Sequence, residues 1–111
     1  MAVPCEVRIG EVVDGVIDVA VAGEIDMACA HVLFDGLLRA ADVPQVREIA
    51  TNLSAVGFID SSGLASLVRA QRELAERRQA VTVSAASRPV ALLFELTATG
   101  PLFGIEATTT D

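Results

Sequence analysis

The 111-residue chain contains no lysine, no tryptophan and no tyrosine, and its eight basic residues are all arginines. Fifteen acidic residues outnumber them, so the formal net charge is −7 and the pI is near 4.5. Binding to nucleic acid relies on clustered lysines and arginines that neutralise phosphates. The composition therefore argues against a nucleic-acid-binding protein, and a role in transcription would have to act through another protein.

Long hydrophobic runs are also missing, although 52% of the residues are hydrophobic. No charge-free apolar stretch approaches the length of a membrane span, and no charged N-terminal region with a cleavage site opens the chain. The sequence therefore predicts a cytoplasmic protein without membrane insertion. Because its length suits one hydrophobic core, we predict a single domain over residues 1–111, with a core at about 5–108 and a short polar C-terminal tail.

Cysteine and histidine are too few for a structural zinc site, which needs four ligands in paired spacings. The candidates are Cys5, Cys29 and His31. Cys29 and His31 lie two residues apart in a predicted helix, so their side chains point to different faces. We expect buried or half-buried thiols in a reducing compartment, without a chemical role, and no bound metal or cofactor.

Apolar periodicity predicts an α/β fold in which strands alternate with helices. Val7 and Ile9 belong to a first strand, and Asp14-Gly15 forms the hairpin turn to a second, antiparallel one. Further strands are predicted at residues 46–53 and 80–85. The apolar positions of the first helix are Ala30, Leu33, Phe34, Leu37, Leu38 and Ala41, and one face of the second helix is marked by Leu64, Leu67, Val68, Gln71 and Leu74. This order predicts a mixed sheet of four to five strands with helices packed against it.

Local signals mark the ends of the helices. Asp26 is predicted to cap the first helix, and Ser87 the third, which runs through Leu96. On the polar face of the second helix, Glu73 is spaced to pair with Arg69 and Arg77.

The stretch from Gly57 to Leu64, Gly-Phe-Ile-Asp-Ser-Ser-Gly-Leu, carries the strongest functional signal in the chain. It places two hydroxyls and a glycine where an apolar run ends and a helical pattern begins. A helix N-terminus presents unpaired main-chain N–H groups, which suit a phosphate. We therefore predict a site at Asp60, Ser61, Ser62, Gly63 and Leu64.

Several of these residues also have a purely structural interpretation. Ser61 could serve only as the cap of the second helix, since serine and aspartate are preferred at that position. Asp26 and Asp60 could likewise be caps, or they could be carboxylates that flank a functional serine.

The string Asp60-Ser61-Ser62-Gly63-Leu64 after a hydrophobic strand, with Ala22-Gly23-Glu24-Ile25-Asp26 before the first helix, resembles the STAS domain of bacterial anti-sigma factor antagonists. The segment Phe94-Glu95-Leu96-Thr97, followed by Leu102-Phe103 and a last short strand at Ile105, resembles the C-terminal half of the same family. The resemblance extends from about Val7 to Thr108 without a gap. The chain departs from the family pattern at Ala98-Thr99-Gly100-Pro101.

The resemblance implies a protein that switches partners. In the family, the serine directly after the motif aspartate is phosphorylated by the partner, and by position that serine is Ser61. Ser62 matches a second hydroxyl that is usually unmodified. The unphosphorylated form would bind an anti-sigma factor, a serine kinase of the histidine-kinase-like ATPase fold, and release a sigma factor. A phosphatase would reverse the modification.

Two other classes of function remain open at this point. One is a STAS module of a membrane transporter or a lipid-trafficking system, or one that senses a small ligand. The full motif favours the antagonist, because a transporter partner gives no reason for a phosphorylatable serine at this turn. The other is an enzyme, which is disfavoured because the sequence supplies no pocket, metal or third catalytic group to work with Asp26 and Asp60. No nucleophile accompanies His31 in any motif order.

Overall fold

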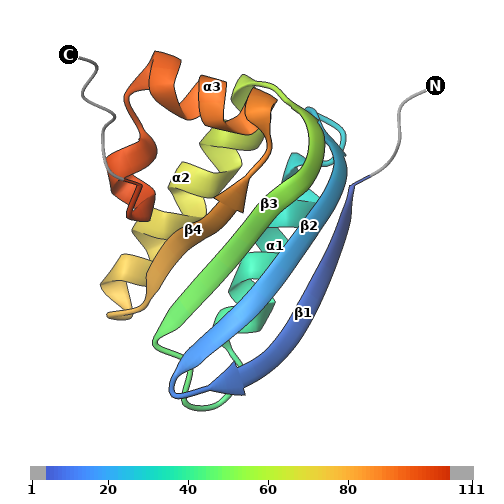
Figure 1. Ribbon diagram of the computed structural model, residues 1–111. Coiled ribbons are helices and arrows are strands. Elements are labelled where there is room, and N and C mark those ends of the chain that lie inside the picture. Colours follow the sequence, from blue (N-terminus) through green and yellow to red (C-terminus); the bar gives the residue numbers. More distant parts are fainter. Residues whose placement is uncertain (1–4, 106–111) are drawn as a thin grey trace.

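The computed structural model describes residues 5–105 and arranges them as a sheet with helices packed against it (Figure 1). In chain order the elements are β1 (Glu6–Val13), β2 (Val16–Ile25), α1 (Ala30–Ala41), β3 (Glu48–Ile59), α2 (Ser61–Glu76), β4 (Ala80–Ala86), α3 (Arg88–Thr97) and the 3₁₀-helix η1 (Gly100–Phe103).

The sheet has the strand order β1-β2-β3-β4. The first pair is antiparallel, and the pairs β2/β3 and β3/β4 are parallel. The predicted mixed sheet is therefore confirmed. The predicted hairpin is confirmed too, since Asp14 (φ 52°) and Gly15 (φ 80°) both adopt the left-handed conformation that a two-residue turn of this kind requires.

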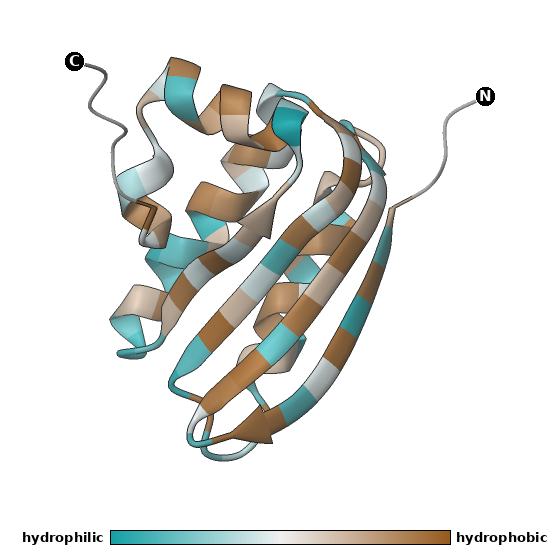
Figure 2. Ribbon diagram, viewed as in Figure 1, coloured by the Kyte–Doolittle hydropathy of each residue, from teal (hydrophilic) through white to brown (hydrophobic). Residues whose placement is uncertain are grey.

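The hydrophobic core lies between the sheet and the helices α1 and α2, which lie beside each other on one face of it (Figure 1). In the first half of β1, from Glu6 to Ile9, hydrophilic and hydrophobic residues alternate, as Figure 2 shows. Of the predicted helix positions, those that are buried are Leu33, Leu37 and Ala41 in α1 and Leu64, Leu67 and Leu74 in α2. Ala40 and Ala70 are buried as well, whereas Gln71 is only half-buried. Each fully buried leucine contributes about 1.5–3 kcal/mol, so this interface holds the helices on the sheet.

Strand β3 is longer than predicted. We expected it to cover residues 46–53, but it runs to Ile59. Two register shifts against β2 each add an extra residue to β3. Its residues that face the helices are consequently spaced by two at first and then by three: Ile49, Thr51, Leu53, Val56 and Ile59. The alternation ends at Leu53 although the strand continues, and this continuation carries the chain directly to Asp60.

The end of α3 shows how the chain accommodates its departure from the family pattern. The helix ends at Thr97, and Ala98 takes the left-handed conformation (φ 55°) that usually favours glycine. Ser87 is the N-cap residue as predicted, but its hydroxyl donates to the main-chain oxygen of Val56 (2.5 Å) instead of capping the helix.

The prediction of a last short strand at Ile105 is wrong for that residue, which does not lie in a strand. Ile105 follows η1, and its main-chain N–H donates to the oxygen of Gly100 (3.0 Å), so the chain turns back on itself there. Phe103 of η1 is fully buried, with its ring 5.4 Å from that of Phe94. The predicted polar tail, Thr108–Asp111, lies outside the described residues.

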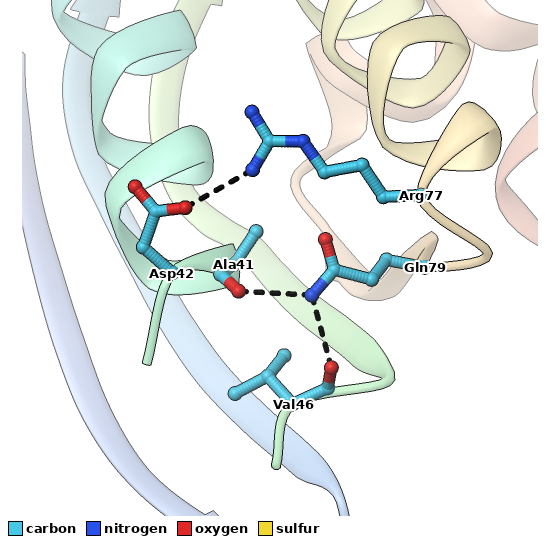
Figure 3. A network of polar contacts seen from close by, with 5 residues as sticks. All are labelled: Ala41, Asp42, Val46, Arg77 and Gln79. Carbon is cyan, nitrogen blue, oxygen red and sulfur yellow. Dashed lines mark hydrogen bonds and ion pairs between the residues drawn. The ribbon is translucent and has the colours of Figure 1, made fainter. Parts of the chain in front are cut away.

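Polar contacts join the C-terminal ends of α1 and α2 at the end of the sheet where β3 begins (Figure 3). The side-chain amide of Gln79 donates to the main-chain oxygens of Ala41 (2.8 Å) and Val46 (2.9 Å). Arg77 pairs with Asp42 across the two helices, with 3.0 Å between Nη1 and Oδ1. These contacts fix both helices relative to the start of β3.

The pairing of Glu73 with Arg69 and Arg77, which the sequence spacing allows, does not occur among residues 5–105. Arg77 pairs with Asp42, and the guanidinium of Arg69 lies 4.5 Å from the centre of the Phe34 ring. Contacts between α1 and α2 thus replace contacts within α2. No helix between residues 5 and 105 is both long and apolar enough to cross a membrane.

Two buried hydroxyls in this core lead to opposite expectations. Thr51 is fully buried, and its hydroxyl has no hydrogen-bond partner within residues 5–105, whereas the hydroxyl of buried Ser66 donates to Ala30 (2.7 Å). We predict that Thr51→Val raises the free energy of unfolding by about 1 kcal/mol, because the substitution removes an unpaired buried hydroxyl. The matched Ser66→Ala variant should lose about 1 kcal/mol. Urea denaturation measures both, and a less stable Thr51→Val variant would contradict the expectation.

Candidate functional site

The site is built where two parallel strands end side by side. The last residues of β2 and β3, Ile25 and Ile59, are partners in the sheet. Asp26 and Asp60 follow them directly, and the Asp60 main-chain N–H donates to the oxygen of Ile25 (3.1 Å). The fold thus places at one edge of the sheet two aspartates that are far apart in the sequence.

A glycine lies at the register shift just before this alignment. The second register shift between β2 and β3 lies between Gly23 and Glu24, and Gly23 has φ 97°, in the left-handed region that glycine adopts without strain. The bulge brings Ile25 opposite Ile59. Gly23 in the segment from Ala22 to Asp26 therefore has a structural reason.

Asp60 caps α2, as its structural interpretation predicted. Its backbone is extended (φ −105°, ψ −175°), and its carboxylate oxygen Oδ1 accepts hydrogen bonds from the main-chain N–H groups of Ser62 (2.9 Å) and Gly63 (3.0 Å). A cap of this kind contributes about 1 kcal/mol to stability.

Ser61 is consequently the first residue of the helix and not its cap. Its side chain is exposed, and its hydroxyl makes no hydrogen bond to any other residue between 5 and 105. Ser62 is half-buried. The interpretation of Ser61 as only a helix cap is therefore wrong, because Asp60 already does that work. An accessible hydroxyl remains at the positive end of a 16-residue helix.

Gly63 and Leu64 fix the position of this turn relative to the sheet. A Cβ atom added to Gly63 would lie 2.7 Å from Cγ2 of Ile25, 2.8 Å from Cγ1 of Ile59 and 3.0 Å from the main-chain oxygen of Ile25. The start of α2 therefore approaches the ends of both strands so closely that a side chain does not fit. Leu64 is only 8% exposed and belongs to the core. Both residues hold the first turn in place, so Ser61 faces outward.

Asp26 caps a turn and not the first helix, so that prediction is wrong. Its Oδ1 accepts from the main-chain N–H groups of Ala28 (3.0 Å) and Cys29 (3.2 Å). The helix itself begins at Ala30, with Cys29 as an N-cap residue whose side chain makes no capping bond. The chain makes one additional turn between Asp26 and α1, and Met27 projects from it.

Two exposed apolar residues beside the aspartates were missed by the sequence analysis. Met27 directly follows Asp26 and is 78% exposed, and Phe58 precedes Asp60 by two residues and is 47% exposed. The sequence did contain a signal for them, because neither residue falls at the positions where the apolar residues of the neighbouring strand or helix recur. Single exposed apolar side chains are ordinary, whereas several that gather in one patch are typical of contact surfaces. We refer to Asp26, Met27, Phe58, Asp60 and Ser61 as the switch surface.

The switch surface is separate from the main cleft among the described residues, and it includes no cluster of metal ligands. Within the described residues, no group of three or more His, Cys, Asp or Glu side chains could hold a metal ion. His31 is exposed on α1. A cleft of about 600 Å³ lies between β4, α3 and η1, but none of the residues of the switch surface lines it.

Comparisons with known proteins agree with this geometry. The model of the STAS domain family matches residues 9–111. Among solved structures, the chain is similar to an anti-sigma factor antagonist from Mycobacterium paratuberculosis, with 30% identity, a TM-score of 0.78, and coverage of 97% of this chain and 92% of that one.

Two further structures share the fold. They are the anti-sigma factor antagonist SpoIIAA in its unphosphorylated form (21% identity, 94% and 89% coverage, TM-score 0.73) and the Bacillus SpoIIAA in its phosphorylated form (20% identity, 94% and 92% coverage, TM-score 0.67).

The tight approach at Gly63 can be tested against a second glycine in the same stretch. We predict that Gly63→Ala lowers the free energy of unfolding by about 1–3 kcal/mol, because overpacking against Ile25 and Ile59 outweighs the better helix propensity of alanine. A Cβ atom at Gly57 would meet nothing within 4 Å, so Gly57→Ala should stay within about 0.5 kcal/mol of the parent. Chemical denaturation distinguishes the two, and equal stabilities would show that the approach is not constrained.

Proposed function

The chain belongs to the STAS domain family, and we propose that it is an anti-sigma factor antagonist. In this proposal the unphosphorylated protein binds an anti-sigma factor and so releases a sigma factor. A partner serine kinase of the histidine-kinase-like ATPase fold phosphorylates Ser61 and ends the interaction, and a phosphatase restores it. The chain itself then acts by binding in the cytoplasm, where sigma factors work, and not as an enzyme.

The observation that carries this proposal is the uncommitted hydroxyl of Ser61. Asp60 supplies the cap of α2 through its bonds to Ser62 and Gly63, so the helix does not need the Ser61 side chain. Because Ser61 is exposed in the first turn, a kinase could reach it without unfolding the chain. Its phosphorylation would break no hydrogen bond that holds the fold.

The charges around Ser61 explain how a phosphate could act as a switch. A phosphate adds about 1.5–2 negative charges at neutral pH, and the partial positive charge at the start of α2 lets the fold itself tolerate them. Asp26 and Asp60 already make this edge acidic. A partner that covers it would have to desolvate the phosphate beside two carboxylates, and a few kcal/mol of such cost lowers affinity by several hundredfold.

Such a switch needs no change of fold. SpoIIAA has been solved in an unphosphorylated and in a phosphorylated form, and the present chain is similar in fold to both. This likeness supports a mechanism in which the modification changes the surface and leaves the scaffold as it is.

A module of a transporter or lipid-trafficking system, or a domain that senses a small ligand, is the alternative. The cleft between β4 and α3 favours the last of these, since its volume of about 600 Å³ would accommodate a small molecule. A ligand-sensing function would leave the Ser61 hydroxyl without a role, however, because the cleft is lined by other residues. We therefore place the antagonist first.

Ser61 variants test the switch directly. The partner is first captured from native cell extract with the unmodified protein and identified by mass spectrometry. We predict that Ser61→Asp binds it at least about 100-fold more weakly, because the added charge lies beside Asp26 and Asp60. Ser61→Ala should bind within about threefold of the parent and remain equally stable, because the Asp60 cap is intact. Calorimetry gives both affinities, and equal binding of the two variants would contradict control by charge.

The modified residue is identified in the same system. After incubation with the partner and ATP, the phosphate is expected on Ser61 in the parent and in a Ser62→Ala control, and is expected to be absent from Ser61→Ala. Phosphate confined to Ser62 would assign the switch to the half-buried neighbour.

Met27 should anchor the partner. We predict that Met27→Ala weakens capture about tenfold or more, because large apolar side chains at the centre of an interface carry much of its binding energy. Val13 is a matched control, because it is 66% exposed but lies at the hairpin, at the other end of β2 from Asp26. Val13→Ala should leave calorimetric affinity unchanged, and equal losses in both variants would show that the switch surface is not the contact.

A further inference from the structure

The fold brings together the two cysteines that the sequence analysis treated as unrelated thiols. The Cys5 main-chain N–H donates to Sγ of Cys29 (3.5 Å), and Sγ of Cys5 donates to the main-chain oxygen of Cys29 (3.4 Å). Each sulfur therefore contacts the backbone of the other residue. Both side chains are half-buried and neither forms a disulfide in this structure.

Regular elements hold this contact in place. Cys5 directly precedes β1, whose first residue, Glu6, pairs with Ala22 near the end of β2. The side chain of Val7 lies against Gly36 of α1, where an added Cβ atom would come within 2.7 Å of it. Strand pairing and helix packing thus direct Cys5 toward the turn that leads into α1, at whose end Cys29 lies.

We propose that Cys5 and Cys29 are a redox modification site, at which a reversible disulfide joins the start of β1 to the start of α1. A disulfide spans Cα atoms about 4.4–6.8 Å apart, and each of the two sulfurs lies within 3.5 Å of a backbone atom of the other cysteine, which places the two residues in direct contact. Closing the bond would require the two side chains to rotate toward each other. The site does not depend on the proposed function.

The environment of the pair assigns different roles to the two sulfurs. Burial raises the pKa of Cys5 to about 12, and the hydrogen bond with Cys29 and the charge of the Cys29 side chain contribute to this increase. Cys5 thus keeps its proton at neutral pH, and a thiolate is the reactive form of a cysteine. Cys29 is therefore the sulfur that is oxidised first, and Cys5 resolves the product.

With a peroxide as the oxidant, the chemistry balances in two steps. The Cys29 thiolate attacks one oxygen of hydrogen peroxide, the O–O bond breaks, and the departing hydroxide takes up the thiol proton as water, which leaves a sulfenic acid. The Cys5 sulfur then attacks the sulfenic sulfur, so the S–S bond forms while the S–O bond breaks. The departing hydroxide leaves as a second water with the Cys5 proton. Two thiols are oxidised and one peroxide is reduced, and a reducing thiol reverses the bond by exchange.

The disulfide would act on the turn that carries part of the switch surface. The main-chain N–H of Cys29 is bound by Oδ1 of Asp26 (3.2 Å), and Met27 lies between the two residues. A covalent link to β1 would hold this turn to the edge of the sheet. Under the proposed function, the redox state would then bias how the turn meets a partner.

The test uses the full chain, treated with hydrogen peroxide and analysed with and without a reducing agent. The oxidised protein should be monomeric and lighter by about 2 Da, with a Cys5–Cys29 cross-linked peptide. Its melting temperature should rise by at least about 5 °C, because the bond restricts the unfolded chain, and should return on reduction. Three outcomes would overturn the proposal: disulfide-linked dimers, thiols that stay unoxidised, or thiols that gain oxygen atoms while the loss of about 2 Da is not seen.

Single variants separate the two roles. In Cys5→Ser, the sulfenic acid should accumulate on Cys29, about 16 Da heavier, because no resolving thiol is present. In Cys29→Ser, Cys5 should react much more slowly, because its pKa remains raised by burial. The reduced variants should melt within about 2 °C of the reduced parent, which shows that they fold. Faster oxidation of Cys5 than of Cys29 would contradict the assignment.

Discussion

The close approach of the start of α2 to the ends of β2 and β3 is the constraint on which the rest of the site depends. Gly63 permits it, because any side chain there would overlap Ile25 and Ile59. The hydrogen bond from Asp60 to the oxygen of Ile25 joins the two strand ends at the same level. Once the helix is seated in this way, Asp60 can cap it, Leu64 enters the core, and Ser61 is left on the outside. The accessibility of Ser61 is thus a consequence of packing beneath it.

Among the five residues from Asp60 to Leu64, three belong to a scaffold and Ser61 carries an exposed hydroxyl outside it. Asp60 satisfies the orphan N–H groups of the helix, while Gly63 and Leu64 fix its distance from the sheet. Ser61 contributes nothing to this framework. Modification of a residue without structural duties changes the charge of the surface at little cost to stability. At the far end of the helices, Gln79 and the pair Arg77–Asp42 hold the scaffold independently of the site.

The sequence predicted those parts of the fold that depend on local periodicity and turn chemistry. The hairpin at Asp14-Gly15, the three helices and the site turn belong to this group. What it missed depends on contacts between distant strands. The bulges of β3 against β2 interrupt the alternation after Leu53, so a search for a period of two could not find the second half of the strand. The same register decides that Asp26 lies beside Asp60, and the pairing of β1 with β2 decides that Cys5 meets Cys29. No spacing along the chain contains that information.

The edge of the sheet where β2 and β3 end is thus open to two different chemistries. Under the proposed function, Ser61 would act through charge, since a phosphate would add to the field of Asp26 and Asp60, and salt would weaken this effect unless a partner excludes water. The proposed disulfide at Cys29 would act through geometry, since Cys29 terminates the turn that carries Asp26 and Met27. A partner that binds across both turns would sense the two together, because its contact with Met27 depends on the position of one turn and its desolvation cost on the charge of the other. The same few residues would then couple phosphorylation and oxidation without any change in the core.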